Sequence, residues 1–181
     1  WRQTNDPYKI WLSEIILQQT QVQQGLPYFN NFIREFPTIF DLAKSSEDKV
    51  LKLWQGLGYY SRARNLHYTA KYICSKYDGD FPKNYKDILS LKGVGDYTAS
   101  AISSFAYNKR YAVLDGNVIR VLSRVFGIDS YFDTTSGKNQ FKKLADFNLP
   151  IKDSYSYNQA IMEFGALVCK PKAPKCIDCT F

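Results

Sequence analysis

Residues 91–102 read LKGVGDYTASAI and carry the strongest structural signal in the chain. Gly93 and Gly95 can adopt backbone conformations that other residues avoid, and they leave backbone N–H groups uncovered where a helix is expected from Tyr97. N–H groups at a helix start, with the helix dipole behind them, form a ready site for an anion. The pattern L-x-G-V-G-x-x-T-A therefore indicates a helix-hairpin-helix, which holds a DNA phosphate without reading sequence. The alternative is an ordinary glycine-rich turn between two helices.

The charge of the chain bears on that choice. The 181 residues include 24 Lys and Arg against 17 Asp and Glu, which gives a net charge of +7. An excess of positive charge favours a polyanionic partner, so we prefer the DNA-binding interpretation of the hairpin. Apolar residues make up 45% of the sequence, as in globular rather than disordered proteins. The apolar runs are far shorter than the roughly 20 residues of a membrane helix and no signal peptide precedes them, so we expect no membrane partner.

Helical patterns extend over nearly the whole chain, and no pair of strands, repeat or low-complexity tract interrupts them. Asp6 followed by Pro7 is typical of a helix N-terminus. The expected helices lie within residues 5–21, 28–37, 45–58, 61–79, 84–90, 97–107, 117–126, 137–147 and 155–168. The sequence therefore predicts an all-α fold.

The cysteines are unevenly placed. Three of the four lie in the last thirteen residues, CKPKAPKCIDCTF, whereas Cys74 falls within an expected helix. This distribution favours a metal site in a reducing compartment over a disulfide scaffold. Zinc is one candidate, although zinc sites usually combine two short pairs of ligands.

Two carboxylates stand out, and each has a simpler alternative. Asp115 in AVLDGNVIRVLSR precedes an expected helix, so it can be a plain N-cap. A carboxylate there can also stabilise a developing positive charge. Glu14 shares a helix face with Ile10 and Leu17, and apolar neighbours raise the pKa of a carboxyl group, which suits a general acid. A glutamate on a helix is otherwise a solvated surface residue.

The motif LKGVGDYTA followed by LDGNVIRVLSR resembles the endonuclease III superfamily of base-excision DNA glycosylases. Within it, DPYKIWLSEIILQQTQV, GLGYYSRARNLH and NQAIMEFGALVC are similar to the adenine DNA glycosylases of the MutY family. The resemblance covers nearly the whole chain. It implies a helix-hairpin-helix glycosylase fold of two helical lobes, about 23–130 and 1–22 plus 131–168, with an active-site cleft between them and an iron–sulfur loop at 169–181. The family's C-terminal lesion-recognition domain is expected to be absent from this chain.

The resemblance also implies a cofactor. The family carries a 4Fe-4S cluster on four cysteines spaced C-x6-C-x2-C-x5-C, and Cys169, Cys176 and Cys179 match the first three. The fourth ligand is expected just beyond Phe181. The resemblance thus favours iron–sulfur over zinc.

The implied reaction is hydrolysis of the N-glycosidic bond of adenine mispaired with 8-oxoguanine or guanine. Glu14 would protonate N7 of the purine, and Asp115 would stabilise the oxocarbenium-like sugar. Asn117 and Tyr97 would orient the pair. Tyr97 stands where bifunctional members carry a nucleophilic lysine, so the resemblance implies a glycosylase without strong strand-cleaving lyase activity.

The implied partner is double-stranded DNA with an A:8-oxoguanine or A:G mismatch, bound by a monomer inside the cell, in the cytoplasm or nucleoid if bacterial. Gln19 and Tyr59 would enter the duplex when the base is extruded. The implied DNA-binding and pocket residues are Arg2, Leu17, Gln18, Gln19, Thr20, Tyr59, Tyr60, Arg62, Arg64, Gly93, Val94, Gly95 and Gln159. Two alternatives are a bifunctional endonuclease III-like glycosylase/lyase and a non-catalytic helix-hairpin-helix module.

Overall fold

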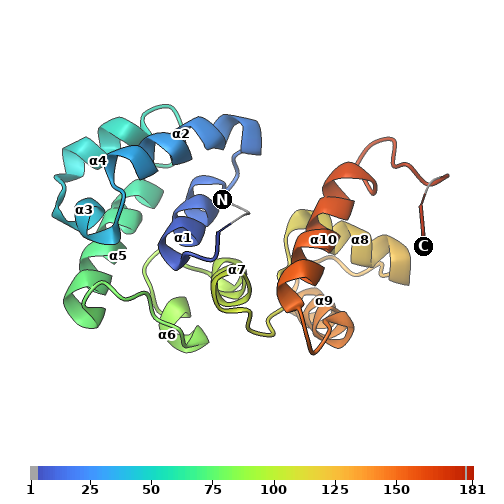
Figure 1. The fold of residues 1–181 in the computed structure, drawn as a ribbon. Coiled ribbons are helices and arrows are strands. Elements are labelled where there is room, and N and C mark those ends of the chain that lie inside the picture. Colours follow the sequence, from blue (N-terminus) through green and yellow to red (C-terminus); the bar gives the residue numbers. More distant parts are fainter. Residues whose placement is uncertain (1–3, 178) are drawn as a thin grey trace. The chain divides into compact units, whose positions relative to one another are not determined.

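The computed structural model describes residues 4–177 and 179–181, and every regular element in that part of the chain is an α-helix (Figure 1). The helices are α1 (Pro7–Ile16), α2 (Val22–Glu35), α3 (Ile39–Lys44), α4 (Glu47–Trp54), α5 (Ser61–Tyr77), α6 (Tyr85–Leu89), α7 (Asp96–Tyr107), α8 (Gly116–Phe126), α9 (Thr135–Asn148) and α10 (Ser154–Leu167). The all-α prediction is confirmed. None of these helices is long and apolar enough to cross a lipid bilayer.

The chain forms two compact units, Trp1–Tyr107 and Asn108–Phe181. Helix α1 packs within the first unit, against α7, α2 and α5, and α8 packs within the second, against α10 and α9. This division differs from the lobes expected at 23–130 and at 1–22 plus 131–168, which stay a prediction.

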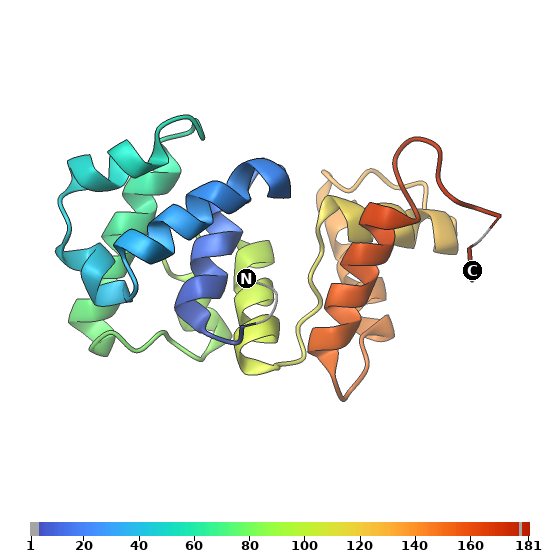
Figure 2. The ribbon, with the colours of Figure 1, turned by 45° about the horizontal axis from the view of Figure 1, so that its top comes forward.

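Helix α1 is the buried centre of the first unit (Figures 1 and 2). Asp6 caps its N-terminus by accepting a hydrogen bond from the Tyr8 backbone N–H at 2.9 Å, with Pro7 in the first helical position. All residues from Ile10 to Ile16 are buried. A short helix that is covered on every side must be apolar almost throughout, so any ionisable residue within it stands out.

Helices α3 and α4 pack on α5, and α6 packs on α7, to complete the first unit. The six-residue helix α3 was not predicted, because the helical pattern was taken to end at Pro37. A capping box marks its start: Thr38 and Asp41 exchange side-chain to backbone hydrogen bonds. The largest fully buried side chains of this unit are Trp11, Trp54, Phe32, Phe36, Leu12, Ile16, Leu42, Leu66, Ile73, Ile88 and Ile102.

The second unit is built around α8. Its core consists of Val118, Leu122, Phe141 and Ala145, contributed by α8 and α9. Helix α10 crosses α8 at Gly165, where a Cβ atom would lie only 2.7 Å from Cβ of Asn117. A glycine is therefore needed for α10 to lie this close to the start of α8.

Candidate catalytic and nucleic-acid-binding residues

The predicted hairpin is present between α6 and α7. Gly93 has a φ of +83°, and a Cβ there would approach Cβ of Asn65 to 3.0 Å, so glycine is required on both counts. Val94 is buried and its N–H donates to the Leu91 carbonyl at 3.1 Å, which tightens the turn. Gly95 does not use a left-handed conformation, contrary to the expectation from the sequence, and a Cβ there would meet no atom within 4 Å.

The start of α7 has the features of an anion site. The first N–H groups of a helix lack helical acceptors, and the dipole adds partial positive charge there. Lys92 is exposed next to the turn, with its ammonium 4.7 Å from the centre of the Tyr68 ring. The nearby carboxylate of Asp96 accepts a hydrogen bond from the Tyr85 hydroxyl at 3.2 Å. This geometry can hold one phosphate through backbone contacts.

Substituting Gly95 tests that assignment. The Gly95→Glu variant should fold normally, because the new Cβ has open space, but its carboxylate should repel a phosphate at the start of α7. Affinity should fall equally for matched and mismatched duplexes, and the slope of log K against log salt should shrink by about 0.9, one phosphate contact. Ser136→Glu at the exposed start of α9 is the control for added charge. A loss confined to one mismatch would contradict the phosphate assignment.

Glu14 lies in the second half of α1 and is only 6% exposed, between the buried Ser13 and Ile15. A solvated surface glutamate is thus the wrong interpretation of this position. A buried carboxyl group with apolar neighbours fits the general acid expected from the sequence. Tyr97 lies half-buried on α7, the helix against which α1 packs.

Asp115 is held by two donors at the start of α8. One carboxylate oxygen accepts the Val118 backbone N–H at 2.7 Å, so Asp115 is the N-cap of the helix. The other accepts the Asn117 side-chain N–H at 2.8 Å. The two donors fix the direction of the carboxylate, which is half-buried. Asp115 therefore serves as the N-cap of α8 and is at the same time oriented by Asn117.

Arg120 was not identified from the sequence, although it belongs to the same network. Its guanidinium donates to the Asn117 side-chain oxygen at 2.9 Å and to the carbonyls of Gly165 (2.6 Å) and Cys169 (2.8 Å). Arg120 thereby orients the amide that contacts Asp115 and links α8 to the end of α10. The only sequence signal was its spacing of three residues from Asn117, which places both on one helix face.

The remaining predicted contact residues lie on two turns and on α10. Gln19 is exposed in the turn that follows α1, and Tyr59 and Tyr60, 68% and 39% exposed, precede α5. In the first turn the Thr20 hydroxyl donates to the Gln18 carbonyl at 3.2 Å. The other predicted positions are Leu17 and Gln159, both half-buried, and Arg2, which lies outside the described residues.

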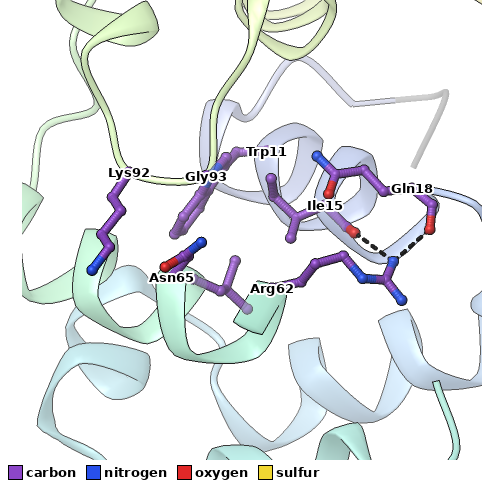
Figure 3. Close-up of a pocket in the computed structure, with 8 residues that line it drawn as sticks. Trp11, Ile15, Gln18, Arg62, Asn65, Lys92 and Gly93 are labelled. Atoms are coloured by element: carbon purple, nitrogen blue, oxygen red, sulfur yellow. Dashed lines mark hydrogen bonds between the residues drawn. The ribbon is translucent and has the colours of Figure 1, made fainter. Parts of the chain in front are cut away.

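The two arginines of α5 are used differently. Arg64 is exposed and forms an ion pair with Glu47 at 3.4 Å. Arg62 instead donates to backbone carbonyls at the end of α1, as Figure 3 shows for Ile15 and Gln18. It lines a small cavity beneath the hairpin together with Trp11, Ile15, Gln18, Asn65, Leu66, Lys92 and Gly93. Its predicted contact with the DNA backbone stays a prediction.

The cysteine-rich end of the chain starts at Cys169, whose carbonyl accepts a hydrogen bond from Arg120. Arg124 donates to the sulfur of Cys169 at 3.4 Å and to the Lys170 carbonyl at 2.7 Å. The Cys179 N–H donates to the Cys176 carbonyl at 3.3 Å, and Cys176 is exposed. Within the described residues, no three His, Cys, Asp or Glu side chains are arranged to hold a metal ion. The thiols suit iron or zinc chemically, and the cluster itself stays a prediction.

The sequence has clear relatives. Residues 12–146 match the model of the HhH-GPD superfamily base excision DNA repair proteins. The chain is 43% identical, over 99% of its length and 52% of the relative's, to an adenine DNA glycosylase of Buchnera aphidicola subsp. Schizaphis graminum (strain Sg). Its identity to the adenine DNA glycosylase of Homo sapiens is 41%, over 95% of this chain and 32% of the human protein. The chain thus spans about half the length of the bacterial relative and about a third of the length of the human one.

Solved structures agree on the fold. The structure of a thermostable thymine-DNA glycosylase superposes with a TM-score of 0.90 at 32% identity, over 99% of this chain and 83% of the other. A non-covalent endonuclease III–DNA complex gives a TM-score of 0.84 at 20% identity, over 96% of this chain and 80% of the other, which supports the fold alone. The expected helix-hairpin-helix glycosylase fold is confirmed.

Proposed function

The chain belongs to the HhH-GPD superfamily of base excision DNA repair proteins, and from that premise we propose that it is a monofunctional adenine DNA glycosylase. It would hydrolyse the N-glycosidic bond of adenine mispaired with 8-oxoguanine or guanine in double-stranded DNA. The substrate is inferred from the adenine DNA glycosylases to which the sequence is similar. Such an enzyme would work on DNA inside the cell.

The burial of Glu14 is the observation that carries the hydrolytic part of this proposal. Burying a carboxyl group in a nearly apolar helix opposes folding unless the group is neutral or well partnered. A position that keeps such a group must be explained by its function or by its contacts. A neutral carboxyl at physiological pH can donate a proton, as glycoside hydrolysis requires.

We propose that the two carboxylates divide the reaction between them. Glu14 donates a proton to N7 of adenine, so that the base leaves as a neutral molecule and not as an anion. Asp115, oriented by Val118 and Asn117, faces the electron-poor sugar and stabilises its positive charge until water adds. Tyr97 helps to position the reacting nucleotide. Both groups need the base outside the stack, so extrusion precedes chemistry.

Substrate recognition would use the residues that the resemblance identifies. Arg2, Leu17 and Gln159 would line the adenine pocket. Gln19 and Tyr59 would fill the space that the base leaves. Tyr60, Arg64 and the hairpin would hold the backbone.

We also propose that Cys169, Cys176 and Cys179 supply three thiolates to a 4Fe-4S cluster. Such a cluster would tie the end of α10 to the following loop, which carries Lys170, Lys172 and Lys175. Arg124, which donates to the Cys169 sulfur, would lower the electron density on that ligand.

The metal proposal predicts a spectroscopic result. Purified wild-type protein should show the broad visible absorption of an iron–sulfur protein, together with bound iron and acid-labile sulfide. Cys176→Ala should lose the band, because a ligand is removed, whereas Cys74→Ala on α5 should retain it. A colourless protein with stoichiometric zinc would contradict the cluster assignment.

Alkali dependence separates the proposed activity from its two alternatives. The protein is incubated with an end-labelled duplex that contains A:8-oxoguanine, and half of each sample is then heated with alkali. Strand breaks that appear only after alkali indicate a monofunctional glycosylase. Breaks without alkali indicate a glycosylase/lyase, and bound but unbroken DNA in both halves indicates a binding module.

A further inference from the structure

Two turns of the first unit share an unusual backbone conformation. Gln19, after α1, has a φ of 54°, and Tyr59, before α5, has a φ of 45°. Residues other than glycine seldom adopt the left-handed region, because Cβ then crowds the backbone. Such strained residues persist only where the surrounding structure holds them, and they are common at functional sites.

Both strained residues present their side chains to solvent. Tyr59 is 68% exposed, and Gln19 is exposed as well. Burial of these side chains therefore does not account for the strained backbone. Contacts from neighbouring residues must therefore stabilise the backbone of the two turns.

One side chain contacts both turns. The Nη1 atom of Arg62 donates to the carbonyl of Gln18, directly before Gln19, and to that of Ile15 at 3.3 Å (Figure 3). It also donates to the carbonyl of Ile16 at 3.3 Å. The Nη2 atom donates to the carbonyls of Leu57 at 3.0 Å and Gly58, directly before Tyr59, at 3.4 Å. The planar guanidinium thus spans the two turns, one nitrogen to each.

Aromatic rings fix the position of the guanidinium. Its central carbon lies 5.1 Å from the ring centre of Trp54, which is fully buried, and 5.7 Å from that of Tyr59. Stacking on a buried ring restricts the arginine to one orientation. The positive charge also complements the carbonyls at the C-terminus of α1, which lack partners within the helix.

We propose that Arg62 is a positioning residue that sets the spacing of Gln19 and Tyr59 and so prepares both side chains to enter the duplex together. This inference rests on the proposed function, because it assigns Arg62 to base extrusion. Arg62 would act through the two turns, and neither on the leaving base nor on a phosphate. A lysine could not replace it, since an ammonium cannot present two nitrogens in a fixed plane.

The test uses Arg62→Lys, which keeps the positive charge and removes the two terminal nitrogens of the planar guanidinium. Arg34→Lys on the exposed face of α2 is the matched control. Fluorescence of 2-aminopurine, placed beside the adenine opposite 8-oxoguanine, reports unstacking in a stopped-flow instrument. We expect Arg62→Lys to slow the unstacking phase at least about threefold, and the slope of log K against log salt to stay unchanged. A slope reduced by about 0.9 would show a phosphate contact and overturn the proposal.

A double-mutant cycle separates positioning from a general structural role. In a Gln19→Ala, Tyr59→Ala background, Arg62→Lys should have no further effect on the unstacking rate, because the side chains that it positions are gone. An additive effect would overturn the proposal. So would failure of both Arg62→Lys and Arg62→Gln to fold, since Arg62 would then serve the fold itself. Wild-type protein that neither unstacks nor releases adenine would refute the proposed function, and the inference with it, whereas an unaffected Arg62→Lys would refute the inference alone.

Discussion

Replacing Glu14 by glutamine should lower the single-turnover rate of adenine release by roughly 10²–10⁴, the usual range for loss of a general acid. Glutamine keeps the shape of the side chain and most of its hydrogen-bonding capacity, and position 14 is buried, so packing should be preserved. What glutamine cannot do is give a proton to the leaving purine. Affinity for the mismatched duplex should stay within a few-fold of wild type, because no phosphate contact is assigned to this residue.

Two controls define that result. Glu35→Gln on the exposed end of α2 makes the same carboxyl-to-amide change outside the proposed site and should leave the rate unchanged. Circular dichroism should show equal helix content in both variants. Adenine release by folded Glu14→Gln at close to the wild-type rate would exclude Glu14 as the acid.

The second large effect is expected at Asp115. Asp115→Asn should reduce adenine release by about 10²–10³, as is typical when a group that stabilises transition-state charge is removed. Asparagine is as good an N-cap as aspartate, so α8 should still begin at Gly116. Asparagine replaces one of the two accepting oxygens by an N–H donor group, so one of the contacts from Val118 and Asn117 loses its acceptor.

The structure provides a closely matched control for this substitution. Asp153 caps α10 by accepting from the Ser156 N–H at 3.3 Å, and it is exposed. Its left-handed conformation also tolerates asparagine. Asp153→Asn should therefore keep full activity at similar stability. If both variants lost activity to the same extent, the effect would belong to helix capping and not to charge at the reacting sugar.

Much of the fold was accessible from the sequence because its helix signals are local. The Asp6–Pro7 start of α1, the Gly93 turn and the Asp115 cap depend on residues a few positions apart, and the structure has all three. The failures were also local. Helix α3 has only six residues, too few for a visible period, and α1 ends at Ile16 where the sequence suggested a longer helix.

The candidate site was predictable only in part. Asp115 and Asn117 are neighbours along the chain, so their contact could be anticipated. The roles of Arg120 and Arg62 could not, because each guanidinium bonds to carbonyls about 45 residues away, and no local pattern encodes those contacts. The sequence suggested a contact of Arg62 with the DNA backbone, which stays a prediction. In the structure its guanidinium donates to carbonyls of two turns in its own unit.

The most direct test of the proposed activity is chromatographic measurement of the free base released in a single turnover. Wild-type protein should release adenine from a duplex that contains A:8-oxoguanine, with strand breaks only after alkali, and should release no thymine from a T:G duplex. Thymine release from T:G would assign the chain to the activity named for its structural relative, the thermostable thymine-DNA glycosylase. If the folded protein binds DNA but releases no adenine, the proposed adenine glycosylase activity is contradicted.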